Sequence, residues 1–248
     1  IDFKSEGFVT GMAAKMFTVA GPVIGSALGV AFTPGRRMTG DMLSFAGGSM
    51  LAISFLELLP ESMNKCGLAG TAVGFAIGLL TMAALEGLFP HRPQGGQKGE
   101  LERTSVLMIL GIFLHNLPEG MAMASAGSME DPRALVTVAL AIAIHNIPEG
   151  ICTSAPYYQA TGRRLRAFLW SASTALPMLG GYLLGKTLLR GLTPYAMGVM
   201  VASVAGLMIH ISCGELLPTA LEEEGKEHPV RPMLWLAAGI LFVMAMEG

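Results

Sequence analysis

Long apolar stretches dominate this sequence, and short segments rich in glycine, proline and charge separate them. The stretches lie near 8–33, 40–62, 67–89, 104–127, 133–156, 166–188, 194–219 and 230–247. Each is long enough to cross the hydrocarbon core of a bilayer, which takes about 20 residues. Only 14% of the residues are charged, against about 25% in soluble proteins. We therefore predict an all-α integral membrane protein of about eight transmembrane helices, folded as a single transmembrane domain over 1–248.

The basic residues are divided unevenly between the two sides of the predicted helix bundle. Ten of the sixteen lysines and arginines lie on the side that follows the odd-numbered spans. Because cytoplasmic loops are enriched in Lys and Arg, this side is expected to be cytoplasmic. Both termini would then lie outside, in a plasma (inner) membrane of the bacterial type.

Two sequence motifs occur twice. The segment His115–Gly120, HNLPEG, recurs on the next span as His145–Gly150, HNIPEG. A second segment, Met50–Pro60, recurs as Met208–Pro218, with matching Met, Ser and Glu-Leu-Leu-Pro residues. Each pair of copies lies an odd number of crossings apart, so the copies run in opposite directions through the membrane. This pattern is typical of transporters with inverted repeats, here helices 1–3 against 6–8 and helix 4 against helix 5.

The HNxPEG motifs place polar groups near the middle of two spans. The six candidate metal ligands are His115, Asn116, Glu119, His145, Asn146 and Glu149. In each motif the histidine and the glutamate are four residues apart and share a helix face. A carboxylate at the bilayer centre costs ~3 kcal/mol or more and is usually paired or faces a cavity. Imidazole, carboxylate and amide oxygen together form a ligand set that suits Zn²⁺, Fe²⁺ or Mn²⁺. One such motif could simply brace a proline kink, but two at the same depth favour a shared ligand.

These motifs resemble the signature of the ZIP (Zrt/Irt-like protein) family of metal transporters, in its bacterial zinc-transporter-like branch. The resemblance extends over the whole chain, through the eight spans and the two Glu-Leu-Leu-Pro helices. It implies uptake of a divalent metal toward the cytoplasm, with Zn²⁺ first and Fe²⁺, Mn²⁺ and Cd²⁺ as alternatives. It also implies an elevator-like movement of helices 1, 4, 5 and 6 past a scaffold of helices 2, 3, 7 and 8. The six residues above take the ligand roles, and Met50 matches a thioether ligand, with a core role as its alternative.

Other polar residues are candidates for the transport pathway. They are Glu57, Glu61, His210 and Glu215. Their alternatives are hydrated carboxylates at the membrane surface and, for the histidine, a packed neutral imidazole. The chain departs from the family pattern at Leu176, where many members have Glu before the proline of the sixth span, and at Gly214, where many have His. The first departure argues against a second metal site and predicts that Leu176→Glu would recruit a second ion.

Other classes of function are compatible with parts of this pattern. The His and Glu residues could form a proton relay, or serve a proton-driven carrier of another solute. An intramembrane zinc hydrolase is disfavoured because the sequence lacks HExxH, so we expect no enzymatic activity and no cofactor beyond the transported ion. The three cysteines show no CxxC spacing, and no basic run indicates a nucleic-acid partner. The expected partners are divalent metal ions and the lipid bilayer, with a homodimer left open.

Overall fold

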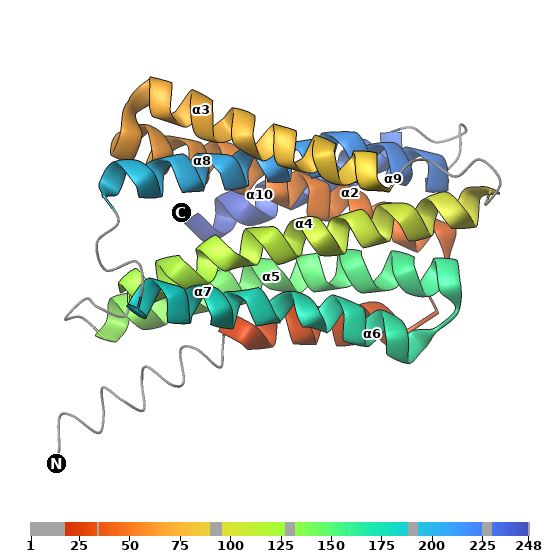
Figure 1. Ribbon diagram of the computed structural model, residues 1–248. Helices are drawn as coiled ribbons and strands as arrows, with labels where there is room; N and C mark the ends of the chain where they lie inside the picture. The colour runs from red at the N-terminus through yellow and green to blue at the C-terminus, as the bar shows by residue number, and fades with distance from the viewer. Residues whose placement is uncertain are drawn as a thin grey trace, which may run out of the picture.

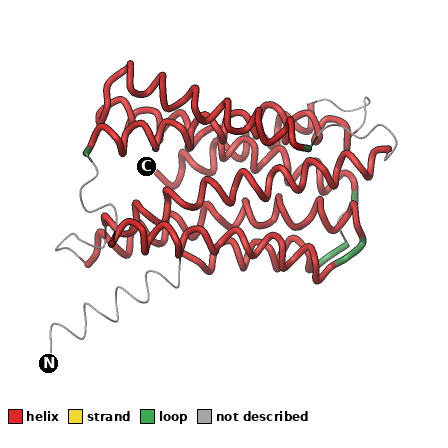
Figure 2. Tube along the Cα trace, in the orientation of Figure 1, coloured by secondary structure: helices red, strands yellow, loops and turns green. Residues whose placement is uncertain are grey.

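The described part of the chain is built from helices packed side by side (Figures 1 and 2). The computed structural model describes residues 18–33, 35–89, 96–126, 132–187, 193–224 and 230–247. Within these helices the side chains of residues 97, 122–126, 132–138, 141, 145, 224 and 247 lie outside the description. In the described ranges every regular element is helical, which confirms the predicted all-α class.

The elements agree with the predicted spans. The helix Thr18–Ala31 belongs to the first span, of which residues 8–17 lie outside the described residues. The others are α2 (Arg36–Ile53), η1 (Ser54–Leu58), α3 (Leu59–Leu88), α4 (Gly96–Ala126), α5 (Pro132–Thr161), α6 (Arg164–Ala172), η3 (Ser173–Ala175), α7 (Leu176–Thr187), α8 (Pro194–Ile211), η4 (Ser212–Leu216), α9 (Leu217–Glu224) and α10 (Val230–Glu247). Among the described residues, three helical runs are long and apolar enough to cross a membrane by length and composition, and two shorter helices are also apolar.

The second and third spans are joined without a loop. Helical structure runs from Arg36 to Leu88 and is interrupted only at Gly67, whose φ is 67°. A glycine adopts this left-handed conformation at little steric cost, and the chain reverses there (Figure 1). The Ser62 hydroxyl hydrogen-bonds that of Thr71 across the reversal at 2.9 Å. In place of the predicted gap between residues 62 and 67, the single non-helical residue Gly67 separates the second and third spans.

The helices form two groups, which lie one above the other in Figure 1. The motif group contains the helix Thr18–Ala31 with α4, α5, α6 and α7. The scaffold group contains α2, η1, α3, α8, η4, α9 and α10. The most extensive packing is within groups, between α3 and α8, α2 and α10, and α4 and α7, whereas α2 with α5 and α4 with α8 form smaller contacts between groups.

Glycines bring backbones together inside each group. A Cβ added at Gly25 would overlap backbone of α5, and one added at Gly78 would overlap the Ser203 carbonyl of α8. Such close approach is how helices pack in lipid, where small residues replace the hydrophobic driving force. Between the groups, by contrast, a Cβ at Gly111 of α4 would meet the side chain of Ile211 on α8. The glycine runs thus hold each group together through tight backbone packing.

The repeated Glu-Leu-Leu-Pro segments share an uncommon local structure. Each copy contains a π-helical turn just before its proline, η1 in one and η4 in the other. Short π-helical turns inside α-helices are rare and are often found at functional sites. Their occurrence at equivalent repeat positions supports the inverted relationship between the second and seventh spans.

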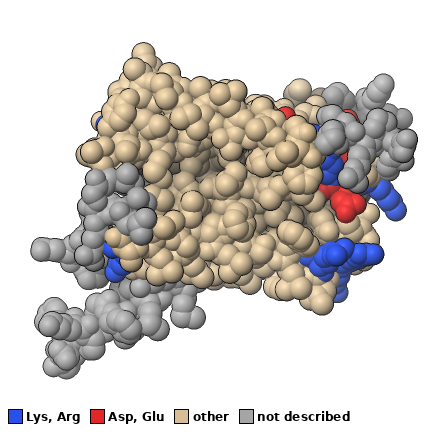
Figure 3. All heavy atoms as spheres, in the orientation of Figure 1, with Lys and Arg blue, Asp and Glu red and all other residues tan. Residues whose placement is uncertain are grey.

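Charge is concentrated at the ends of the helices. Figure 3 shows an uncharged middle band, with a cluster of basic and acidic side chains at the end where α4 begins and α9 ends. Arg36 and Arg231 lie at the starts of α2 and α10, and Arg103 lies about two turns into α4. We refer to this charged end as the basic end.

Candidate metal site

The imidazole of His115 lies against two buried carboxylates. Its Nε2 atom is 2.9 Å from Oε1 of Glu119, one turn further along α4, and 3.5 Å from Oε1 of Glu149 on α5. The side chains of His115 and Glu149 are buried, with exposed fractions of 3% and 4%, and that of Glu119 is 12% exposed. Two antiparallel helices therefore bring His115 and Glu119 of one motif next to Glu149 of the other, and their role as metal ligands stays a prediction.

The asparagines of the two motifs are buried and have different hydrogen-bond partners. Asn146 donates from Nδ2 to Oε2 of Glu119 at 3.1 Å, and Asn116 donates from Nδ2 to the carbonyl of Thr174 at 2.6 Å. Both asparagines are completely buried. In the described part of the chain, the side-chain oxygen of each has no hydrogen-bond partner. Each amide is thus held by its nitrogen, while its oxygen remains as an acceptor.

The distances from His115 to the two carboxylates can be compared with the spacing of ligands around a small divalent ion. Two ligands bound tetrahedrally at about 2.0–2.1 Å from an ion lie roughly 3.3 Å apart, a value between the two His115–carboxylate distances. Among the described side chains, no group of three or more His, Cys, Asp or Glu is arranged so that it could hold a metal ion. The side chain of His145, the other imidazole of the predicted ligand set, lies outside the described residues.

A buried cluster of hydroxyl groups surrounds the backbone beside the second motif. Thr153 donates to the Glu149 carbonyl at 2.9 Å, and Ser171 of α6 donates to the Gly150 carbonyl at 3.1 Å. The Ser26 hydroxyl in turn lies 2.6 Å from that of Ser171. These bonds tie the helix Thr18–Ala31 and α6 to α5, next to Glu149. The sequence pattern did not indicate them, because serine and threonine are common and carry no spacing signal.

Met50 lies in the central apolar cluster of the protein. It is 2% exposed and belongs to a core that includes Leu107 and Ile112 of α4 and Met208 of α8. This environment fits its core alternative, and a thioether ligand role stays a prediction.

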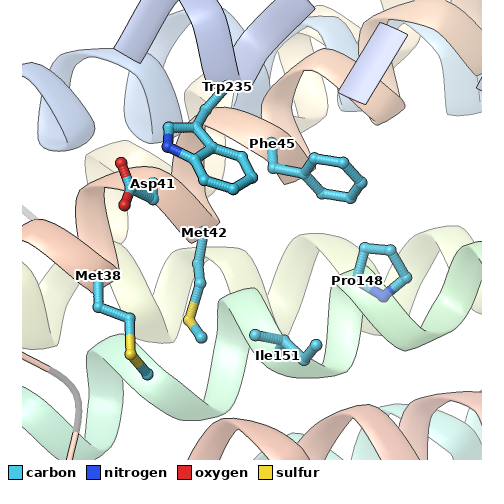
Figure 4. A pocket seen from close by; sticks show the side chains of 7 residues that line it. All are labelled: Met38, Asp41, Met42, Phe45, Pro148, Ile151 and Trp235. Carbon is cyan, nitrogen blue, oxygen red and sulfur yellow. The ribbon is translucent and has the colours of Figure 1, made fainter. Parts of the chain in front are cut away.

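A small apolar cavity adjoins the second motif. It has a volume of about 300 Å³ and lies between α2, α5 and α10, lined by Pro148, Phe45, Trp235 and four neighbours (Figure 4). Asp41 at its edge bonds Arg231 at 2.6 Å. The cavity lies between helices of the two groups. Because nearly all of its lining is apolar, it offers few atoms that could bind a metal ion.

The four predicted pathway residues lie in different environments. Glu57 in η1 and Glu61 in α3 are exposed, and Glu61 pairs with Lys65. His210 of α8 is 2.8 Å from Glu86 of α3, measured from Nε2 to Oε1. A transport role for these three residues stays a prediction, since their surroundings fit both alternatives.

Glu215 is buried in a polar contact between the groups. Its carboxylate is 3.1 Å from Nη1 of Arg103 and accepts a hydrogen bond of 2.9 Å from the Thr104 hydroxyl. Arg103, Thr104 and Glu86 are partners that the sequence pattern did not indicate, since they lie more than 100 residues from the groups they bond.

The sixth span approaches the site through its backbone. The Thr174 carbonyl that accepts from Asn116 belongs to η3, and Thr174 and Ala175 are buried. Leu176, by contrast, is 61% exposed. This exposed position gives no support to the expectation that a carboxylate at position 176 would join a second metal site, and that expectation stays a prediction.

A bundle of antiparallel membrane-length helices, built from inverted repeats around a buried polar site, defines the class of polytopic membrane transporters. Residues 90–247 match the sequence profile of the ZIP zinc transporter family. The chain is 38% identical over 244 residues to the zinc transporter ZupT of Enterobacter sp. (strain 638), covering 92% of this chain and 91% of that one. It is 39% identical over 236 residues to the zinc transporter ZupT of Corynebacterium efficiens, covering 86% of each. The chain belongs to the ZIP family, whose members are transporters and not enzymes.

Proposed function

We propose that this protein moves a divalent transition metal, with zinc as the main substrate, toward the cytoplasm through the HNxPEG residues of α4 and α5. The observation that carries the proposal is the buried contact of His115 with Glu119 and Glu149, to which Asn146 adds a hydrogen bond. Two carboxylates carry two negative charges, which one dication neutralises. In a low-dielectric interior such neutralisation is needed before the ion can leave water.

The proposed preference for zinc is supported by chemistry and by similarity. Zinc accepts imidazole and carboxylate together in four-coordinate sites, and nitrogen and oxygen sites bind it more tightly than Mn²⁺ or Fe²⁺. The two relatives described above are named as zinc transporters. Fe²⁺, Mn²⁺ and Cd²⁺ are the competing substrates to be tested.

The packing supports movement of one group past the other. Glycine contacts between backbones hold α4 to α7 and α3 to α8. The core between the groups consists of aliphatic and methionine side chains, among them Met108 of α4 and Leu207 of α8. Since a backbone contact at glycine cannot slide without overlap, whereas flexible side chains can repack, we infer that the groups move as units along this surface.

The proposed direction rests on the basic end. Lysine and arginine collect on the cytoplasmic side of membrane proteins, so the basic end would face the cytoplasm and both termini the outside. Release of the metal would then occur near Arg103 and Glu215.

The test is zinc uptake by purified protein in liposomes that contain a zinc-sensitive dye. Glu119→Gln and Glu149→Gln keep the side-chain shape and remove one charge each. Leaving a buried charge without its partner costs about 3–5 kcal/mol, so uptake at low zinc should fall at least about a hundredfold. Glu102→Gln, on the exposed face of α4, is the matched control and should transport normally. Unchanged uptake in both site variants would reject this site.

A further inference from the structure

A hollow that combines arginine with apolar side chains lies at the start of α6, at the basic end. It has a volume of about 570 Å³ and is lined by Arg163, Arg164, Leu165, Arg166, Leu169 and Trp170. Figure 3 shows basic side chains gathered where α6 begins. The three apolar residues are 70%, 57% and 51% exposed, in chain order. The hollow therefore offers positive charge and exposed apolar surface side by side.

The arginines of the hollow differ from other arginines of the basic end in their partners. Arg36, Arg103 and Arg231 each form an ion pair with a glutamate or an aspartate. None of the acidic side chains that the structure describes pairs with the three arginines of the hollow. Arg164 instead donates from Nη2 to the carbonyl of Ala31 at 2.8 Å, at the end of the first helix. The described residues thus leave the charge of the hollow unbalanced.

The spacing along α6 separates the charged and apolar parts of the hollow by depth. Arg166 and Trp170 are four residues apart and share a helix face, and Trp170 lies about 6 Å further along the axis. Because α6 begins at the basic end, the guanidinium lies nearer to water and the indole nearer to the middle of the bilayer. Tryptophan is enriched at the level of the lipid headgroups. A phospholipid has the same order, with its phosphate at the surface and its acyl chains below.

We propose that the hollow binds an anionic phospholipid, with the headgroup phosphate at Arg163 and Arg166 and an acyl chain along Leu169 and Trp170. Guanidinium groups form strong, charge-assisted hydrogen bonds with phosphate oxygens. The exposed apolar residues favour a lipid over a soluble phosphate, since only the lipid covers them. A zwitterionic lipid would bind less well, because its ammonium group would lie close to the arginines. The inference requires only that the helices lie in a bilayer, and it does not depend on the proposed transport.

Tryptophan fluorescence in liposomes tests the proposal. The chain contains two tryptophans, so Trp235→Phe leaves Trp170 as the reporter and Trp170→Phe leaves Trp235. Each variant is placed in liposomes in which either phosphatidylglycerol or phosphatidylcholine carries brominated acyl chains, which quench a tryptophan that they contact. Brominated phosphatidylglycerol should bind beside Trp170 at least about fivefold more strongly than brominated phosphatidylcholine.

Trp235 is a matched control. It is 41% exposed and lies four residues after Arg231, just as Trp170 lies four residues after Arg166. Arg231, however, is paired with Asp41. The two brominated lipids should therefore quench Trp235 about equally.

Two charge variants of the Trp170 reporter locate the binding residues. Arg163→Gln with Arg166→Gln should abolish the preference for phosphatidylglycerol. Arg37→Gln with Lys98→Gln removes the same number of charges from the same end, and both residues are exposed and lie outside the hollow. This second variant should keep the preference.

Three results would overturn the inference. One is equal quenching of Trp170 by the two brominated lipids in the protein with its arginines intact, a measurement that does not depend on how the arginine variants fold. Another is an undiminished preference after Arg163→Gln with Arg166→Gln. The third is loss of the preference on adding inorganic phosphate, but not chloride at the same ionic strength, because that would identify a site for a soluble anion.

Discussion

The charge of the site predicts one tightly bound metal ion per chain. The described site contains two carboxylates, Glu119 and Glu149, which balance one dication. A second ion would leave an excess of two positive charges. At ~4 Å separation and an effective dielectric of 20, two dications repel each other by about 16 kcal/mol. Without a third carboxylate nearby, a second ion should bind weakly and wash out.

In the family pattern, the sixth span supplies the third carboxylate that a second metal ion would need. Its closest approach is the Thr174 carbonyl, which bonds Asn116, and Leu176 is 61% exposed. Leu176→Glu should therefore leave the metal count unchanged, against the expectation from the family pattern. The exposed position places the added charge outside the buried site.

The assay is elemental analysis of zinc per protein before and after dialysis, for the unmodified chain, Leu176→Glu and Glu149→Gln. We expect the unmodified chain and Leu176→Glu each to retain about one ion. Glu149→Gln should retain far less than one. Two ions retained by the unmodified protein would refute the charge argument. A gain of one ion in Leu176→Glu would show that the sixth span turns toward the site when metal binds.

The remaining predictions concern pH, packing and the pathway. Zinc affinity should fall as the pH is lowered, and binding should release protons, because protonated imidazole cannot ligate a metal; calorimetry that finds constant affinity between about pH 5.5 and 7.5 would contradict ligation by His115. Gly78→Ala should lower the thermal stability by about 1–3 kcal/mol, since its Cβ would overlap α8, whereas Gly87→Ala, with open space around it, should not; equal melting curves would contradict the glycine contacts. If His210 binds the ion during its passage, His210→Ala should slow zinc uptake severalfold and leave equilibrium zinc binding unchanged. Unaltered uptake would favour the alternative of a packed imidazole.

The spans could be predicted because hydropathy reports burial in lipid, but their ends could not. α4 begins at Gly96, eight residues before the predicted span at 104, because the segment before it contains Lys, Glu and Arg. These residues form helix readily in water and are invisible to a search for apolar runs. The hydropathy pattern thus located the part of each helix inside the bilayer and missed the part beyond it.

The site was predicted more completely on α4 and α5 than on the sixth span. A regular α-helix fixes the relation between residues four apart, so the contact of His115 with Glu119 follows from spacing. In the sixth span, the three residues of η3 form a 3₁₀ turn. Each such residue turns the chain by about 20° more than an α-helical residue, so three of them rotate α7 by roughly 60° about the span axis. Regular helical spacing does not include that rotation, so the exposed position of Leu176 could not be predicted from the sequence.

The orientation of the two asparagine amides is fixed by hydrogen bonds. Each amide nitrogen is held within the motif group, Asn116 by the Thr174 carbonyl and Asn146 by Glu119. This fixes which way the amide faces, because nitrogen can only donate and oxygen can only accept. A buried oxygen without a hydrogen bond costs about 1–3 kcal/mol, and the side-chain oxygens of both asparagines are such atoms. If a cation binds either oxygen, as we propose, it would relieve that cost, and the loaded site would gain in free energy relative to the empty one.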